Sequence, residues 1–324
     1  MPPGDTLVHI ALIATFTCTL SLAATEPIMS PDANWGPASI GSTHGGVVVL
    51  DDGRVLVNTD TDKGTIVLNK DGEPAGNIAA TWPAIHAMTV QREPAGERIY
   101  AAHLRGKQAL KLRPDGTMVW AIGVPMESGK YTDPNHYNPT GIAVAPDGRV
   151  FVADGYGTQW VHIFGPDLAY QSSFGGRGTG DGQFQTCHGL LLDGRGDTPT
   201  LLVCDRENRR IQRFSLDGDF IEVAVTDLRR PCAMAISPRD GMLAVAELEG
   251  RVTLIRPDGT IAGHLGDNPN TAEHANHGVA PDHWHDGVHT APHGLGWDAK
   301  GNLYVQDWNA HGRITRWVPP TTTQ

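Results

Sequence analysis

The chain has 324 residues, of which 39 are Gly and 23 are Pro. This composition, with short apolar runs and no sustained helical periodicity, favours many strands joined by tight turns over helices. The formal net charge of −11 argues against nucleic acids and anionic membranes as partners.

The first predicted element is an export signal. The stretch from Leu7 to Ala24 is apolar and ends in small residues, which is typical of a signal peptide cleaved near Ala23 or Ala24. No Lys or Arg precedes it, and a membrane anchor is the alternative because the stretch is near the lower length limit for a span. We expect residues 1–24 to be removed and the protein to be exported to the periplasm or the medium, without membrane contact after cleavage.

Six related units follow the N-terminal segment. Each contains a short apolar strand, a turn with Gly and a second apolar strand. The units are "THGGVVVLDDGRVLVNTD" from Thr43, "IHAMTVQREPAGERIYAAH" from Ile85, "PTGIAVAPDGRVFVADG" from Pro139, "CHGLLLDGRGDTPTLLVCDR" from Cys187, "PCAMAISPRDGMLAVAE" from Pro231 and "PHGLGWDAKGNLYVQDW" from Pro292. Most continue into a third strand and another Asp-Gly turn, which is a strong hairpin signal.

These units predict an all-β, six-bladed β-propeller over residues 43–318. When the units are aligned, the position entering the first strand moves from 44 to 293 in five steps, about 50 residues each. Such a period, with four short strands per unit, is typical of propellers. The last unit has only three strands. We therefore expect the mature N-terminal segment, residues 25–42, to supply the fourth strand around Trp35 to Ile40 and close the ring. Residues 319–324 form a tail, and we expect a monomer.

The aligned position is occupied by polar residues in every unit. It holds His44, His86, Thr140, His188, Cys232 and His293. Because the innermost strand of each blade lines the central channel, these residues should form a ring there. Three of the histidines come from alternate blades, about 120° apart. Three imidazoles with one open position are the ligand set of a catalytic zinc site, which predicts zinc on His86, His188 and His293. The alternative is a ring of polar residues at a water-filled rim. For His44 three roles are open: a fourth ligand, a residue that supports the ligands, or a substrate contact.

The chain resembles a known family in these units. The segments "PTGIAVAPDGRVFVADGYGTQWVHIF" and "HGLLLDGRGDTPTLLVCDRENRRIQRF" resemble NHL repeats, and more narrowly peptidyl-α-hydroxyglycine α-amidating lyase (peptidylamidoglycolate lyase). The resemblance implies zinc on the three histidines above. It also implies an essential Tyr156, in "ADGYG", and an active-site Arg206, in "CDRENRR". The structural alternative for Arg206 is an ion pair with an Asp that stabilises the blade, which is common in NHL repeats.

The chain departs from this family at two site positions. The family has an arginine after the second strand of blade 1, where this chain has Asp60, and Arg105 in blade 2 is the candidate substitute. The family's structural calcium uses an Asp directly after the third zinc histidine. This chain has Gly294 there, so we expect no calcium at that position.

A histidine-rich loop and three cysteines complete the candidate residues. The loop, residues 263–291, joins blades 5 and 6. We expect it to cover the channel mouth, with Trp284 as an apolar plug and His285 among the residues near the site. A weak surface metal-binding loop is the alternative. Cys187 and Cys204 are the most plausible disulfide pair, with buried free thiols, including Cys232, as the alternative.

Three functions compete on this sequence. The first is a zinc lyase that cleaves the C–N bond of a hydroxylated small-molecule or peptide substrate at the channel mouth, releasing an amide and an aldehyde such as glyoxylate. The second is a non-catalytic propeller that binds a protein or glycan. The third is a lactonase-like hydrolase, against which the ring argues because it holds histidines and no acids.

Overall fold

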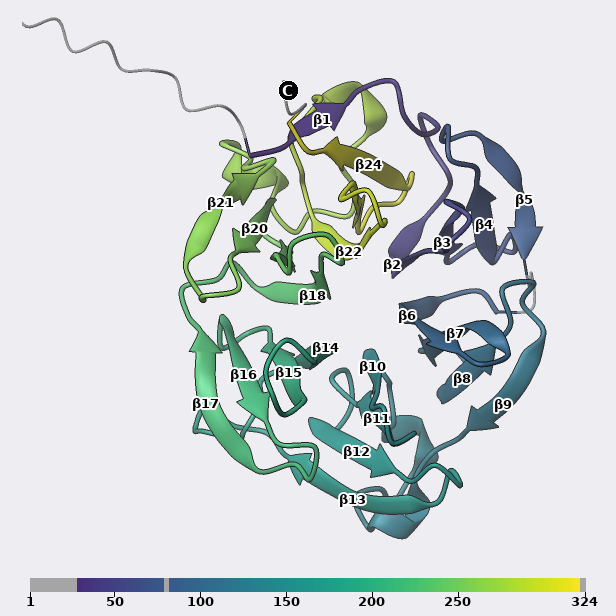
Figure 1. The fold of residues 1–324 in the computed structure, drawn as a ribbon, viewed down its shortest axis with the longest axis vertical. Coiled ribbons are helices and arrows are strands. Elements are labelled where there is room, and N and C mark those ends of the chain that lie inside the picture. Colours follow the sequence, from purple (N-terminus) through teal and green to yellow (C-terminus); the bar gives the residue numbers. More distant parts are fainter. Residues whose placement is uncertain (1–27, 79–81, 321–324) are drawn as a thin grey trace, which may run out of the picture.

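The computed structural model describes residues 28–78 and 82–320. It contains six four-stranded antiparallel sheets arranged as blades around a central axis (Figure 1). The predicted all-β, six-bladed propeller is confirmed. Within these two ranges the only helices are short 3₁₀ turns, and none of them is long and apolar enough to cross a membrane.

The first three blades follow one another in chain order. Blade 1 contains β2 (Thr43–Val49), β3 (Val55–Thr59), β4 (Thr65–Leu68) and β5 (Pro74–Ile78). Blade 2 contains β6 (Ile85–Glu93), β7 (Gly96–His103), β8 (Gln108–Leu112) and β9 (Met118–Ile122). Blade 3 contains β10 (Gly141–Val144), β11 (Val150–Ala153), β12 (Trp160–Phe164) and β13 (Tyr170–Gly175).

The last three blades complete the ring. Blade 4 contains β14 (Cys187–Asp193), β15 (Thr200–Asp205), β16 (Arg210–Phe214) and β17 (Phe220–Val225). Blade 5 contains β18 (Pro231–Ile236), β19 (Leu243–Glu247), β20 (Arg251–Ile255) and β21 (Ile261–Leu265). Blade 6 contains β22 (Pro292–Trp297), β23 (Leu303–Asp307), β24 (Arg313–Val318) and β1 (Ser30–Asp32). The 3₁₀ turns are η1 (Met126–Ser128), η2 (Pro134–His136), η3 (Thr271–Glu273) and η4 (Pro281–His283).

The N-terminal segment closes the ring, but with a strand earlier than predicted. β1 pairs antiparallel with β24, and Asp32 forms an ion pair with Arg316. The predicted strand around Trp35 to Ile40 is wrong, because these residues serve the core instead. Trp35 is 5% exposed and its ring lies 4.8 Å from that of Tyr304. The predicted signal peptide lies outside the described residues.

The apolar side chains form one core between each pair of neighbouring blades. For example, Phe151 and Ile163 of blade 3 pack with Leu201 and Phe214 of blade 4, and all four are 2% exposed or less. The other five interfaces are filled in the same way. Both faces of most strands are therefore buried, which explains their nearly continuous apolar sequence.

The three described cysteines are free and buried. Cys187 lies on β14 opposite Asp205 rather than Cys204, so the two sulfurs are not placed for a bridge. The disulfide that the sequence allowed does not form, and the buried-thiol alternative is correct.

Candidate metal centre

The start of each inner strand turns one side chain towards the channel. In blades 1, 2, 4, 5 and 6 the register between the first and second strands shifts at the aligned position. Such β-bulges re-aim a side chain next to functional sites. They explain why a residue at the edge of an apolar strand faces the axis here, and why that residue is polar.

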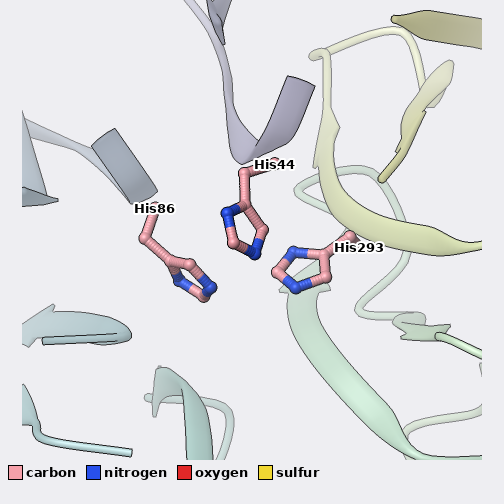
Figure 2. A group of neighbouring side chains, drawn as sticks. All are labelled: His44, His86 and His293. Carbon is pink, nitrogen blue, oxygen red and sulfur yellow. The ribbon is translucent and has the colours of Figure 1, made fainter. Parts of the chain in front are cut away.

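The four histidines of the ring lie together. The ring centroids of His86, His188 and His293 form a nearly equilateral triangle, with sides of 4.6, 4.7 and 4.9 Å. His44 forms a second triangle with His86 and His293. Its ring centroid lies 4.6 Å from that of His86 and 4.9 Å from that of His293. Figure 2 shows His44, His86 and His293 pointing towards one another from three separate strands. The structure thus brings the three predicted rings together. By ligand atoms, however, the groups that lie within 4.8 Å of one another are His44, His86 and His293, and His188, Cys232 and His293.

Two histidines are oriented by the main chain of the neighbouring blade. The Nδ1 atom of His86 lies 2.6 Å from the carbonyl oxygen of Thr140, and that of His188 lies 2.7 Å from that of Cys232. Because a carbonyl only accepts, both Nδ1 atoms carry the proton and both Nε2 atoms present a lone pair. This is the arrangement in which metal-ligating histidines are held. The two members of the ring that are not histidines therefore orient the imidazoles.

The lone pairs converge on the phenol of Tyr156. Its oxygen lies 3.2 Å from Nε2 of His86, 3.1 Å from that of His188 and 3.4 Å from that of His44. A phenol has one proton, and Arg206 donates to the same oxygen from 3.1 Å. At least one of the two lone pairs of His86 and His188 therefore has no donor from Tyr156. Converging nitrogen lone pairs in a buried site are suited to a cation.

His293 is the most poorly satisfied member of the ring. It is 3% exposed, and neither ring nitrogen has a hydrogen-bond partner within the described residues. By the pattern of the other two ligands, Nδ1 would donate to the main chain of blade 1, but this bond is not formed. A buried imidazole without partners is costly unless something binds it. The unpartnered nitrogens of His293, beside the other imidazoles of the ring, fit a metal ion that prefers imidazole.

Burial keeps these imidazoles neutral. The pKa values of His86, His188 and His293 are well below the usual value, mainly because burial penalises the charged form and next because the neighbouring histidines repel a proton. Burial also lowers the pKa of His44 to about 4. In contrast, burial raises the pKa of Tyr156 to about 12, although the charge of Arg206 opposes the rise. Neutral imidazoles are the form that binds metals.

The loop that carries Tyr156 is held by a buried carboxylate. Asp154 ends β11 and accepts hydrogen bonds from the backbone N–H groups of Asn138 and Thr158 and from the hydroxyl of Tyr131, at 2.6 to 2.7 Å. Tyr156 follows two residues later, on the face where the histidines lie. A rigid loop fixes the phenol at the centre of the ring.

The structure separates the two explanations for Arg206. In blade 4 the position of Asp154 is taken by Asp205, which is fully buried. The Nε of Arg210 donates to Oδ2 of Asp205 at 2.8 Å. Arg210 therefore performs the blade-stabilising role. Arg206 is free to reach the ring, where its guanidinium lies 5.4 Å from the centroid of Tyr156 and donates to Glu207 at 2.9 Å.

Arg105 does not reach the ring within the described contacts. It is exposed, and its Nη2 donates to the main-chain oxygen of Asp60 at 3.1 Å. Burial raises the pKa of the Asp60 carboxyl, with Arg105 acting in the opposite direction. The expected substitute for the family's arginine therefore sits beside Asp60 and away from Tyr156.

In the histidine-rich loop, the two predicted residues Trp284 and His285 do not contact the histidine ring. Trp284 donates to the carbonyl of Val279 at 3.2 Å and lies under the guanidinium of Arg313, 5.4 Å away. His285 is exposed, and its carbonyl accepts from Arg313. None of their described contacts is with the histidine ring, so the structure does not support Trp284 as a plug or His285 as a neighbour of the site.

The sequence interpretation missed His277 and Trp308. Trp308 stacks on His44, with 6.1 Å between their ring centroids. His277 in turn packs against Trp308, with 4.8 Å between their ring centroids. Trp308 directly follows β23, which is the same position that Arg206 occupies after β15. Extending the repeat alignment one residue past the second strand would have identified it.

The position of the family's calcium ligand has a steric constraint here. A Cβ atom on Gly294 would lie 1.9 Å from the carbonyl oxygen of Gly45. An Asp at this position would require the backbone of blade 1 to move.

The comparisons with known proteins agree with this architecture. Residues 137–164, in blade 3, match the NHL repeat family. Protein lin-41 of Caenorhabditis elegans is 30% identical over 159 residues, which is 45% of this chain but only 13% of lin-41. The chain is a six-bladed β-propeller in which one segment matches the NHL repeat, and it spans only a small part of the length of lin-41.

Solved structures show the same fold at low identity. Virginiamycin B lyase from Staphylococcus aureus has a TM-score of 0.57 at 16% identity, covering 90% of this chain and 99% of that one. A gluconolactonase from Xanthomonas campestris has a TM-score of 0.60 at 14% identity, covering 87% of this chain and 89% of that one. At these identities the similarity establishes the propeller and carries no information on substrate.

Proposed function

We propose that this protein is a zinc-dependent lyase of the peptidyl-α-hydroxyglycine amidating-lyase type. The observation that carries the proposal is the convergence of His86, His188 and His293 from alternate blades as buried imidazoles, of which His293 has no hydrogen-bond partner at either ring nitrogen within the described residues. The placement of Tyr156 and Arg206 against the same ring supports it. These residues are the ones that the family resemblance selects.

The reaction needs neither oxidant nor water. In a carbinolamide substrate, the hydroxyl loses its proton and its carbon–oxygen bond becomes a carbonyl. The adjacent C–N bond breaks, its electron pair stays on the nitrogen, and that nitrogen gains a proton. The products are an amide and an aldehyde, which is glyoxylate when the carbon also bears a carboxylate. Zinc, when bound by the three histidines, would act as a Lewis acid that makes the hydroxyl more acidic.

The residues of the chain supply proton transfer and charge. Tyr156 lies at the centre of the ring, where its phenolate form would take the hydroxyl proton and its phenol form would return a proton to nitrogen. With a pKa of about 12, the phenol needs more positive charge around it than Arg206 alone provides. Arg206 donates to the phenolic oxygen, and its guanidinium also suits a substrate carboxylate.

The test is turnover of α-hydroxyhippurate to benzamide and glyoxylate by the purified chain, measured together with its zinc content. We expect activity in proportion to stoichiometric zinc. Zinc-loaded, folded protein without turnover of this or a neutral carbinolamide would contradict the lyase proposal.

A propeller that binds a protein or glycan without catalysis is the second candidate. The observation that favours it is the 30% identity to lin-41 over 159 residues. Elemental analysis distinguishes the two, since a scaffold would be free of metal whereas the lyase would carry one ion per chain.

A further inference from the structure

The channel holds four imidazoles within contact distance, one more than the proposed ligand set. His86 and His293 form the shared edge of two triangles, one completed by His188 and the other by His44. The sides of the second triangle, 4.6 and 4.9 Å, match those of the first. By ring distances alone, His44 is placed as well as His188.

The ligand atoms support the same conclusion. One ring nitrogen from each of His44, His86 and His293 lies within 4.8 Å of the others, and His188 forms such a group with His293 and the sulfur of Cys232, so that His293 belongs to both groups. His44 also directs Nε2 at the phenolic oxygen of Tyr156, as His86 and His188 do. Three Nε2 atoms from three blades therefore face one point, and His44 is one of the three.

We propose that His44 is a fourth protein ligand of the metal centre. The inference rests on the proposed function, because it concerns the same ion. His44 lies on β2 and is partly buried. Its only described hydrogen bond is the long one to Tyr156, so that no other described partner competes for its nitrogens.

The imidazole of His44 is held by an aromatic side chain and not by a main-chain carbonyl. His86 and His188 are fixed by carbonyls at Nδ1, but His44 has no such bond among the described residues. Its ring is instead stacked on Trp308 at an interplanar angle of 29°, and Trp308 packs against His277. Aromatic stacking limits the tilt of the imidazole while it leaves both nitrogens free. This support comes from the loop between blades 5 and 6 and from the end of β23.

A four-imidazole centre has a chemical consequence. Four protein ligands complete a tetrahedral sphere, whereas catalytic zinc sites usually keep one position open. An ion that binds all four histidines and also contacts a substrate must accept a fifth donor. Zinc expands to five in some sites, and copper, nickel and iron also favour imidazole. The centre should therefore select borderline transition metals and reject calcium and magnesium, which prefer oxygen.

The test uses Cu²⁺ as a spectroscopic probe of the metal-free full chain. Pulsed electron paramagnetic resonance counts the coupled imidazoles, and competition with a chelator of known affinity gives the Kd. We expect four imidazoles in the wild type and three in His44→Ala. The Kd of His44→Ala should rise at least about 10-fold, since even partners outside the ligand shell cost 10- to 100-fold. His136→Ala is the control, because it removes an exposed imidazole outside the ring, and it should keep four imidazoles and the wild-type Kd.

The possible failures are distinct. If the wild type binds Cu²⁺ at the ring but His44→Ala keeps the same spectrum and Kd, His44 is not a ligand and the three-histidine centre stands. If the wild type binds no ion, or His188→Ala binds as the wild type does, the proposed function fails together with this inference. Circular dichroism verifies folding, and His44→Asn, which keeps a polar side chain of similar size, replaces His44→Ala if the latter does not fold.

Discussion

Arg206 and Arg210 lie four residues apart in one segment, and the structure gives them opposite roles. Arg210 pairs with the fully buried carboxylate of Asp205 and also donates to the carbonyl of Gly180 at 2.7 Å. Arg206 contacts Tyr156 and the partly exposed Glu207. We therefore expect Arg210→Met to act on stability and Arg206→Met to act on activity.

The size of the stability effect follows from the partners that remain. Removing one partner of a buried ion pair costs about 3–5 kcal/mol. Asp205 keeps donors from Gln185, Asn208 and Gln212 at 2.8 to 3.0 Å, which places Arg210→Met near the lower limit. A loss of about 3 kcal/mol corresponds to a fall in Tm of roughly 6–12 °C for a domain of this size class.

Arg206→Met should have a smaller thermal effect. Its ion pair with Glu207 is partly exposed and contributes about 0–1 kcal/mol, and the hydrogen bond to Tyr156 contributes about 1 kcal/mol. At about 1–2 kcal/mol in total, we expect a fall in Tm of roughly 2–8 °C, smaller than that of Arg210→Met, and a large loss of turnover, most of all with anionic substrates. Differential scanning calorimetry on the two variants at equal metal content measures the contrast. If Arg206→Met lost as much stability as Arg210→Met and kept full activity per folded molecule, Arg206 would be structural.

Three further predictions concern the ring itself. His188→Ala should abolish stoichiometric metal binding, whereas His136→Ala, which changes an exposed histidine, should leave the metal content at the wild-type level; elemental analysis of both proteins compares them. Tyr156→Phe should keep the metal and lower turnover by about 10²–10⁴, the usual contribution of general acid–base catalysis, and full turnover would remove the phenol from the mechanism. Gly45→Ala would put a Cβ 2.5 Å from Nδ1 of His293, so the metal Kd should rise in a chelator competition, and an unchanged Kd would mean that His293 is not a ligand.

The sequence by itself determined the blades and the ring. Repeats such as those starting at Thr43, Pro139 and Cys187 carry both the strand pattern and the turn signals, because short apolar strands and Asp-Gly turns are encoded locally. Their alignment also placed the six polar residues in one column. For the same reason the order and starts of the blades were predicted to within two residues, the largest difference being Gly141 against Pro139.

Contacts between distant segments were decided only by the tertiary structure. The closing strand is Ser30–Asp32 because Trp35 fits the core between blades 6 and 1, which no local pattern shows. Trp308 and His277 reach His44 through packing of the loop between blades 5 and 6. The separate roles of Arg206 and Arg210 depend on which side chain faces the buried carboxylate. Each of these outcomes depends on side-chain direction and on residues far apart in the chain, and these are set when the blades pack together.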